Sequence, residues 1–172
     1  MHKAYQLLAA FALTGCAVEP TTFQITAPFD AAMASRLLAK GPNTIRGSAL
    51  IRQRGGGVVT CAGQEVRLTP ATHYANERSG RIYGSWDSGY RSASGNNRMV
   101  FSPDPPEYKN LTLQTICDAQ GFFKFDKVAN GEFLISTIIA WQVNNYRTEG
   151  GAIMQRVTVN GGETKEIVLT PR

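Results

Sequence analysis

The sequence predicts an all-β fold, an antiparallel sandwich of about seven strands, because apolar and polar residues alternate in short segments separated by turn signals. Residues 43–52 and 65–69 alternate in this way, with Val66 and Leu68 on the core side. Only 18% of the 172 residues are charged and 17 are glycine, a composition unlike that of a helical bundle or a coiled coil. The length suits one ordinary domain and leaves no room for two large catalytic lobes.

The second half of the chain supplies most of the remaining strands. They are expected at residues 111–117, 122–126, 132–141, 152–159 and 163–169. Residues 118–121, 130–131 and 160–162 separate these strands, and they contain Asn and Gly, which accept left-handed dihedral angles at little cost. The segment 132–141 is apolar on both faces, which indicates a strand at the centre of the fold.

One short helix is expected before the first of these strands, over residues 30–41. Asp30 can cap its first amides, Lys40 suits its last turn, and Gly41 suits a left-handed stop. Met33 and Leu37 would form its apolar stripe, which is more typical of packing than of ligand contact.

Residues 75–110 break the strand pattern and are expected to form a long inserted loop of the sandwich domain, which as a whole would span residues 28–172. This insertion intermixes aromatic and arginine side chains with Gly, Ser and Asn. Tyr, Trp and Arg dominate interface hot spots, and the small polar residues supply adaptable hydrogen bonds. The alternative is that the aromatic side chains fold back onto the sandwich and the polar ones are solvated. The candidate binding residues are Arg81, Tyr83, Trp86, Tyr90 and Arg91.

The N-terminus has the form of a secretory signal: a single cation, an apolar run too short to span a membrane, and small residues after it. The residues Leu13-Thr14-Gly15-Cys16 resemble the bacterial lipobox. That resemblance implies removal of residues 1–15 and acylation of Cys16 with diacylglycerol and a further acyl chain such as palmitate. Ala17, where inner-membrane lipoproteins of enteric bacteria carry Asp, implies an outer-membrane protein facing the periplasm. Residues 16–27 would then be a tether, whereas a plain signal peptide with a chance cysteine is the alternative.

Two cysteines remain after the lipobox is set aside, Cys61 and Cys117. An even pair in an oxidising compartment predicts a disulfide, and two buried free thiols are the alternative. A zinc site is not expected, because it needs four nitrogen or sulfur ligands at short spacings and the chain beyond the signal segment contains one histidine, His73.

The segments 117–125 and 128–135 resemble carboxypeptidase regulatory-like domains, whose pattern is Asp-x-x-Gly-x-Phe-x-Phe followed by Val-x-x-Gly and an aromatic-x-Leu or -Ile. The resemblance extends weakly over residues 43–170 and implies a transthyretin-like, immunoglobulin-like sandwich of seven strands. The chain departs from the family at residues 129–131, Ala-Asn-Gly in place of Pro-x-Gly, and in the long insertion. In this family such domains are accessory or binding modules, so the resemblance implies a fold and no reaction.

A catalytic centre is not expected, and neither is a cofactor. His73 stands without a second histidine, and the sequence contains no nucleophile elbow, zinc-protease motif, phosphate loop or dinucleotide fingerprint. The acids Asp87, Asp104 and Glu107 could pair in space as a hydrolase dyad, but solvated loop residues are the ordinary interpretation.

Nucleic acid is also excluded as a partner, because the net charge of +5 comes from scattered residues with no basic stripe. The sequence therefore predicts a non-catalytic, lipid-anchored envelope protein that acts as a protein-interaction or structural module. The alternatives are a glycan- or peptide-binding module that uses the insertion, and an envelope hydrolase that uses His73.

Overall fold

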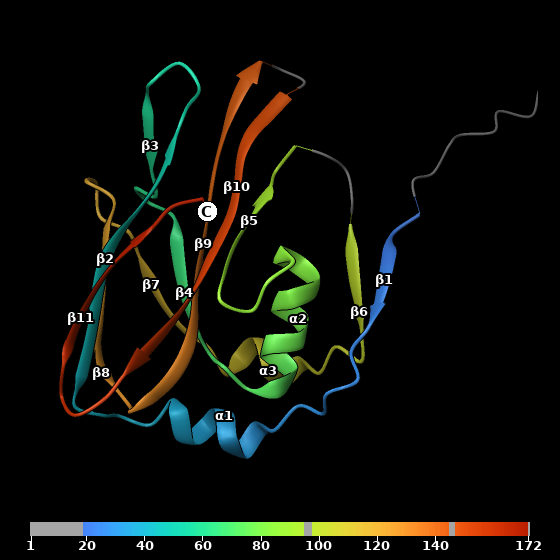
Figure 1. The fold of residues 1–172 in the computed structure, drawn as a ribbon, viewed down its shortest axis with the longest axis vertical. Coiled ribbons are helices and arrows are strands. Elements are labelled where there is room, and N and C mark those ends of the chain that lie inside the picture. Colours follow the sequence, from blue (N-terminus) through green and yellow to red (C-terminus); the bar gives the residue numbers. More distant parts are fainter. Residues whose placement is uncertain (1–18, 95–97, 145–146, 172) are drawn as a thin grey trace, which may run out of the picture.

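Two packed β-sheets form the body of the protein (Figure 1). The computed structural model describes residues 19–94, 98–144 and 147–171. Every neighbouring pair of strands in the larger sheet is antiparallel. In spatial order its strands are β5 (Ser88–Ser92), β10 (Arg147–Val159), β9 (Gly131–Asn144), β4 (Glu65–Pro70) and β7 (Leu113–Ile116).

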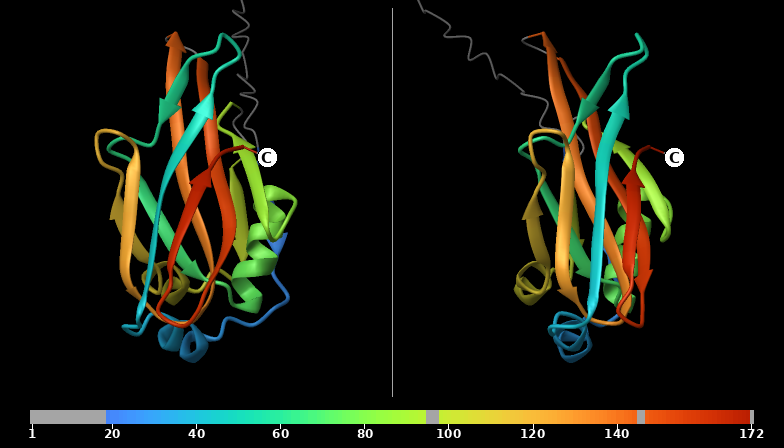
Figure 2. Two further views of the ribbon diagram at one scale, coloured as in Figure 1. Left: turned by 60° about the vertical axis from the view of Figure 1, so that its left-hand side comes forward. Right: turned by 90° about the vertical axis from the view of Figure 1, so that its left-hand side faces the viewer.

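The second sheet is organised around β2 (Asn43–Arg52). On one side β11 (Thr164–Leu169) runs parallel to β2. On the other side β8 (Phe122–Val128) pairs antiparallel with the first part of β2, and β3 (Val58–Thr60) pairs with its last residues. Figure 2 shows this sheet lying across the larger one, with the β2–β3 and β9–β10 hairpins projecting at one end.

Alternating side chains from both sheets meet in one core, as the period-two pattern predicts. Ile45 of β2, Val66 of β4, Ile135 of β9 and Leu169 of β11 are completely buried there. The predicted sandwich is therefore confirmed in outline. The predicted number of strands is wrong, because the described residues form eleven strands.

A disulfide joins Cys61, just after β3, to Cys117, just after β7, with 5.8 Å between their Cα atoms. Since β3 and β7 belong to different sheets, the bond links the two layers of the sandwich. The predicted pairing is confirmed, and the alternative of two free thiols is wrong.

Helix α1 (Ala31–Leu37) closes one end of the sandwich (Figure 1). Asp30 caps it as predicted, since its carboxylate accepts a hydrogen bond of 2.8 Å from the amide of Met33. The expected stop at Gly41 is wrong, because the helix ends at Leu37. Gly41 instead lies against the backbone of Ala129. A Cβ atom at residue 41 would stand only 2.3 Å from the Cα of Ala129.

Residues 21–25 of the expected tether pack onto the domain. Residues 21–24 form β1 (Thr21–Gln24), which pairs in parallel with β6 (Met99–Ser102) of the insertion. The ring of Phe23 stacks on that of Phe101 with 5.9 Å between centroids, and Ile25 is buried beside them. The apolar residues within a polar segment therefore fix it to the domain.

The insertion is not a loop. Its residues form most of α2 (His73–Tyr83) and all of β5, β6 and α3 (Pro106–Asn110), so the described residues include two helices beyond the one predicted. Thr72 caps α2 by accepting from the amide of Ala75, and Gly84 ends it with a φ of 74°. Ala75 packs with Leu134 and Met154, so α2 covers the outer face of the larger sheet. The predicted signal peptide (1–15) and Cys16 lie outside the described residues.

Replacing both Cys61 and Cys117 by Ala is expected to lower the free energy of unfolding by about 4 kcal/mol, because the disulfide restrains a long loop of the unfolded chain. Denaturant unfolding of the wild-type and double-variant proteins measures the difference. Trp86→Ala, which alters an exposed side chain, serves as the control. Equal midpoints for the wild type and the double variant would contradict the expectation.

Candidate functional site

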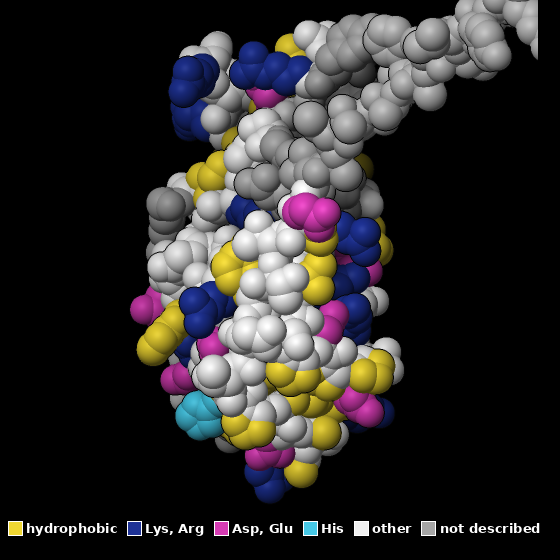
Figure 3. Space-filling view, turned by 90° about the vertical axis from the view of Figure 1, so that its right-hand side faces the viewer, with side chains coloured by type: hydrophobic (Ala, Val, Ile, Leu, Met, Phe, Trp, Pro, Cys, Tyr) yellow, Lys and Arg dark blue, Asp and Glu magenta, His cyan; other side chains and the backbone are white. Residues whose placement is uncertain are grey.

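A groove of about 510 Å³ runs along the exposed side of α2. We call it the α2 groove. It lies on the part of the molecule that also carries β1 and β6, where acidic, basic and apolar side chains intermix (Figure 3). Its lining comes from α2, from the turn that follows α2 and from Ala27, which belongs to residues 19–30. We call residues 19–30 the N-terminal segment.

Helical periodicity explains the cross-section of the α2 groove. His73, Glu77 and Arg81 are spaced four residues apart and form one ridge along α2. The neighbouring row starts at Asn76 and continues with Gly80 and Gly84, and the two glycines leave its floor low. Ala27 and Trp86 complete the lining.

Trp86 is the most exposed of the large apolar side chains described, with 64% of its surface accessible. The edge of its indole ring approaches Gly80 closely, since a Cβ atom at residue 80 would stand 2.7 Å from the indole Nε1. Gly80 therefore allows the ring to lie against the helix while much of its surface stays in solvent.

The backbone beside this ring is held by Arg156 of β10. The guanidinium donates to the carbonyl of Trp86 at 3.2 Å and to Oδ1 of Asn76 at 3.0 Å. It also forms ion pairs with Asp87 at 3.0 Å and Glu132 at 2.9 Å. One arginine thus connects the sheet, the helix and the turn, and it fixes the position of the exposed aromatic residue before any ligand binds.

Glu77 fastens the N-terminal segment to α2. Its Oε2 atom accepts hydrogen bonds from the amide of Ala27 at 2.8 Å and from the amide and hydroxyl of Thr26 at 2.9 and 3.1 Å. These bonds, chiefly that of Ala27, hold the pKa of Glu77 below its usual value, and Arg81 adds to the effect. The carboxylate is therefore engaged, which leaves Arg81 and His73 as the exposed polar groups of the ridge.

Two of the predicted binding residues are packed inward. Tyr83 packs against the cluster that includes Leu134 and Met154, and burial raises its pKa to about 12. Tyr90 packs against the main core and donates a hydrogen bond of 2.7 Å to the carbonyl of Gly150. For these two aromatic residues the structure matches the alternative interpretation, in which they fold back onto the sandwich.

Two other arginines of the insertion, Arg91 and Arg78, differ in their surroundings. Arg91 is half-buried on β5, outside the lining of the α2 groove. Arg78 lies with its guanidinium carbon 3.9 Å from the ring centroid of Phe101 and 5.1 Å from that of Tyr108, and it pairs with Asp104 at 2.8 Å. Arg78 thus links α2 to β6 and α3 within the insertion.

Two of the three acids considered for a hydrolase dyad bind different cations, since Asp87 pairs with Arg156 and Asp104 pairs with Arg78 and Lys109. The third, Glu107, is exposed on α3. Across residues 19–94, 98–144 and 147–171, no His, Cys, Asp and Glu side chains gather into a group that could hold a metal ion. Within the same ranges no helix has the length and apolar character needed to cross a membrane.

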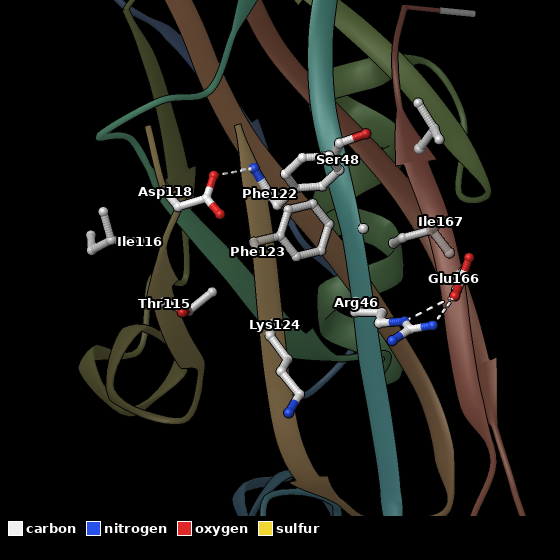
Figure 4. Close-up of a pocket in the computed structure, with 12 residues that line it drawn as sticks. Arg46, Ser48, Thr115, Ile116, Asp118, Phe122, Phe123, Lys124, Glu166 and Ile167 are labelled. Atoms are coloured by element: carbon white, nitrogen blue, oxygen red, sulfur yellow. Dashed lines mark hydrogen bonds and ion pairs between the residues drawn. The ribbon is translucent and has the colours of Figure 1, made fainter. Parts of the chain in front are cut away.

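A second and larger groove, of about 730 Å³, crosses the outer face of the sheet formed by β8, β2 and β11. We call it the sheet-face groove. Figure 4 shows Phe122 and Ser48 side by side on adjacent strands and Arg46 reaching across to Glu166. None of these four residues was a candidate at the level of the sequence, where their outward positions are indistinguishable from ordinary solvated ones.

Comparison with known proteins finds a similar solved structure but no matching family. No protein-family model matches the chain, and no curated protein matches it, so the resemblance to carboxypeptidase regulatory-like domains gains no support from sequence. A crystal structure from Pseudomonas aeruginosa, described as a "putative carbohydrate binding protein", is similar with a TM-score of 0.68 and 25% sequence identity. The match covers 83% of this chain and 97% of the other.

Docking of the N-terminal segment is expected to depend on pH. Because the folded-state pKa of Glu77 lies below its value of 4.5 in a free chain, this stabilisation is present above about pH 4.5 and is lost as the pH falls through the lower folded value. The protection factor of the Ala27 amide, measured by hydrogen exchange, should decrease over that range.

Glu77→Gln should lower the same protection factor at neutral pH, because a neutral amide accepts hydrogen bonds less strongly than a carboxylate. Glu107→Gln, an exposed carboxylate of α3, is the matched control. Undiminished protection of Ala27 in Glu77→Gln would show that the carboxylate does not hold the segment.

Proposed function

We propose that this chain is a non-catalytic carbohydrate-binding module that binds its ligand in the α2 groove. The exposed Trp86 carries the proposal. A flat indole face offers a large apolar surface that matches the C–H face of a pyranose ring, and its cost in conformational entropy on binding is small. Trp86 belongs to the lining of the α2 groove, so this exposed face is available to a ligand bound there.

The rest of the α2 groove suits a sugar as well. Arg81 and His73 present hydrogen-bond donors along the ridge, and the Gly80–Gly84 floor lets a ring lie flat beside the indole. Because Arg156 already fixes the backbone of Trp86, little ordering remains to be done when the ligand binds. The combination of one aromatic platform with a few polar groups is typical of small-ligand sites.

The similar crystal structure supports the same class of ligand. Its description names carbohydrate binding, and its fold matches most of this chain. A second candidate function is protein interaction, the first expectation from the sequence. The sheet-face groove supports it, because its residues Phe122 and Val168 are apolar and exposed.

The location that we propose is the periplasmic face of the outer membrane, with Cys16 acylated. The lipobox-like residues 13–16 and the disulfide between Cys61 and Cys117 support it, since disulfides persist in exported proteins. In that compartment peptidoglycan is the abundant glycan, and lipopolysaccharide and capsular polysaccharide cross it during export, so fragments of these three are the first ligands to test.

Trp86→Ala is expected to weaken glycan binding by about 30-fold, the effect of truncating a central hot-spot residue. Calorimetric titration with fragments of peptidoglycan, lipopolysaccharide core and capsular polysaccharide measures it. Phe122→Ala, an exposed aromatic residue on the other sheet, is the matched control and should bind as the wild type does. Absence of binding to all three classes would refute the function, and binding that survives Trp86→Ala would refute the site.

Gly80→Ala provides a second test that separates binding from folding. Alanine raises the intrinsic stability of a helix by up to about 1 kcal/mol over glycine. Its Cβ atom would nevertheless displace the indole ring of Trp86. We expect lower glycan affinity without a lower melting temperature, and unchanged affinity would contradict the proposed position of the ring.

Cys16→Ser is expected to move the protein from the membrane fraction to the soluble fraction and to abolish metabolic labelling with palmitate, since several acyl chains anchor a protein almost irreversibly. The Cys61→Ala/Cys117→Ala variant controls for the loss of a cysteine as such and should keep the label. Unchanged fractionation of Cys16→Ser would rule out the anchor.

A further inference from the structure

The outer face of β8, β2 and β11 carries two rows of side chains that the proposed glycan site does not use. The strand register defines them, since Ser48 of β2 pairs with Phe122 of β8 on one side and with Val168 of β11 on the other. Phe122 and Val168 are 56% and 51% exposed, and the smaller Ser48 lies between them. In this first row the small Ser48 therefore forms a notch between two exposed apolar side chains.

The second row lies two residues along each strand. Arg46 pairs in register with Lys124 of β8 and with Glu166 of β11, so the charges across the sheet run positive, positive and negative. Arg46 forms an ion pair with Glu166. Lys124 lies at the opposite edge of the row, where it contacts Asp126 of its own strand at 2.9 Å.

We propose that this face binds a second copy of the same chain, with the two sheets stacked and a twofold axis running along β2 between them. Rotation about such an axis exchanges the β8 and β11 sides and keeps each row at its own height. Phe122 of one copy then contacts Val168 of the other, and the two Ser48 notches face each other. The apolar flanks that are exposed in one chain become buried.

Charge complementarity favours this occupant. In the same arrangement Lys124 of each copy faces Glu166 of the other, which makes two equivalent attractive pairs. Arg46 faces its symmetry mate across the axis, but its ion pair with Glu166 draws each guanidinium toward β11, and the two copies place β11 on opposite sides. Like charges are thus kept apart while opposite charges meet.

A cross-linking experiment in intact cells tests the contact. Stacked sheets lie about 10 Å apart, beyond the range of a disulfide, so Ser48→Cys should be joined to its symmetry mate by a short bismaleimide. Thr158→Cys, an exposed position of β10, is the matched control. A covalent dimer from Ser48→Cys alone supports the proposal. A product with the mass of another protein, or no product, overturns it.

A charge exchange tests the pairing in sedimentation equilibrium of the full chain carrying Cys16→Ser. Lys124→Glu should weaken dimerisation by about tenfold, because each copy then presents a carboxylate to Glu166 of the other. The double variant Lys124→Glu/Glu166→Lys should recover the dimerisation affinity of the wild type, because residue 124 of each copy again faces an opposite charge at residue 166 of the other. Within each copy Arg46 is in register with residue 124 and can pair with the new carboxylate there. Failure of the double variant to recover, or a wild-type protein that stays monomeric at every concentration, overturns the proposal.

Phe122→Ser supplies a measurement that folding does not affect, because the side chain is exposed in one chain. It should weaken dimerisation by about tenfold or more with an unchanged melting temperature of the monomer. Trp86→Ala should leave the dimer intact, so the outcome is independent of glycan binding. Dimerisation unaffected by Phe122→Ser would overturn the proposal.

Discussion

The fold depends on the burial of β9 on both of its faces. Phe133 and Ile135 point into the sandwich core, whereas Leu134 points outward and is equally buried. An apolar side chain on the outer face of a sheet needs a covering layer, and α2 provides it through Ala75. The insertion is therefore a structural requirement of the larger sheet, and the groove along α2 is the exposed side of that covering layer.

Sequence patterns predicted those parts of the fold in which local chemistry agrees with the tertiary structure. Alternation located β2, β4 and β8, and Asp30 was identified correctly as a cap. The pattern failed for α2, because its residues are mostly polar or small and only a narrow stripe packs on the sheet. It failed again for β1, whose four residues gain stability only from a strand that lies far along the chain.

The candidate site shows the same division. Aromatic and arginine residues in the insertion suggested Arg81 and Trp86, which line the α2 groove, but the same composition suggested Tyr83 and Tyr90, which pack inward. Whether Tyr83 and Tyr90 are packed or exposed depends on which side of α2 or β5 they occupy, and neither element was predicted. Arg156 could not have been found, because its importance arises from contacts with residues 24 to 80 positions away in the sequence.

The parallel pairing of β1 with β6 limits how far the domain can stand from a membrane. If Cys16 carries lipid, four residues separate it from Thr21, the first residue of β1, and the five Cα–Cα steps of a fully extended chain span roughly 17 Å. A connecting segment this short would keep the domain near the bilayer surface. In a dimer whose twofold axis runs along β2, the two connecting segments begin at the same position along that axis, so both copies can be anchored in one leaflet.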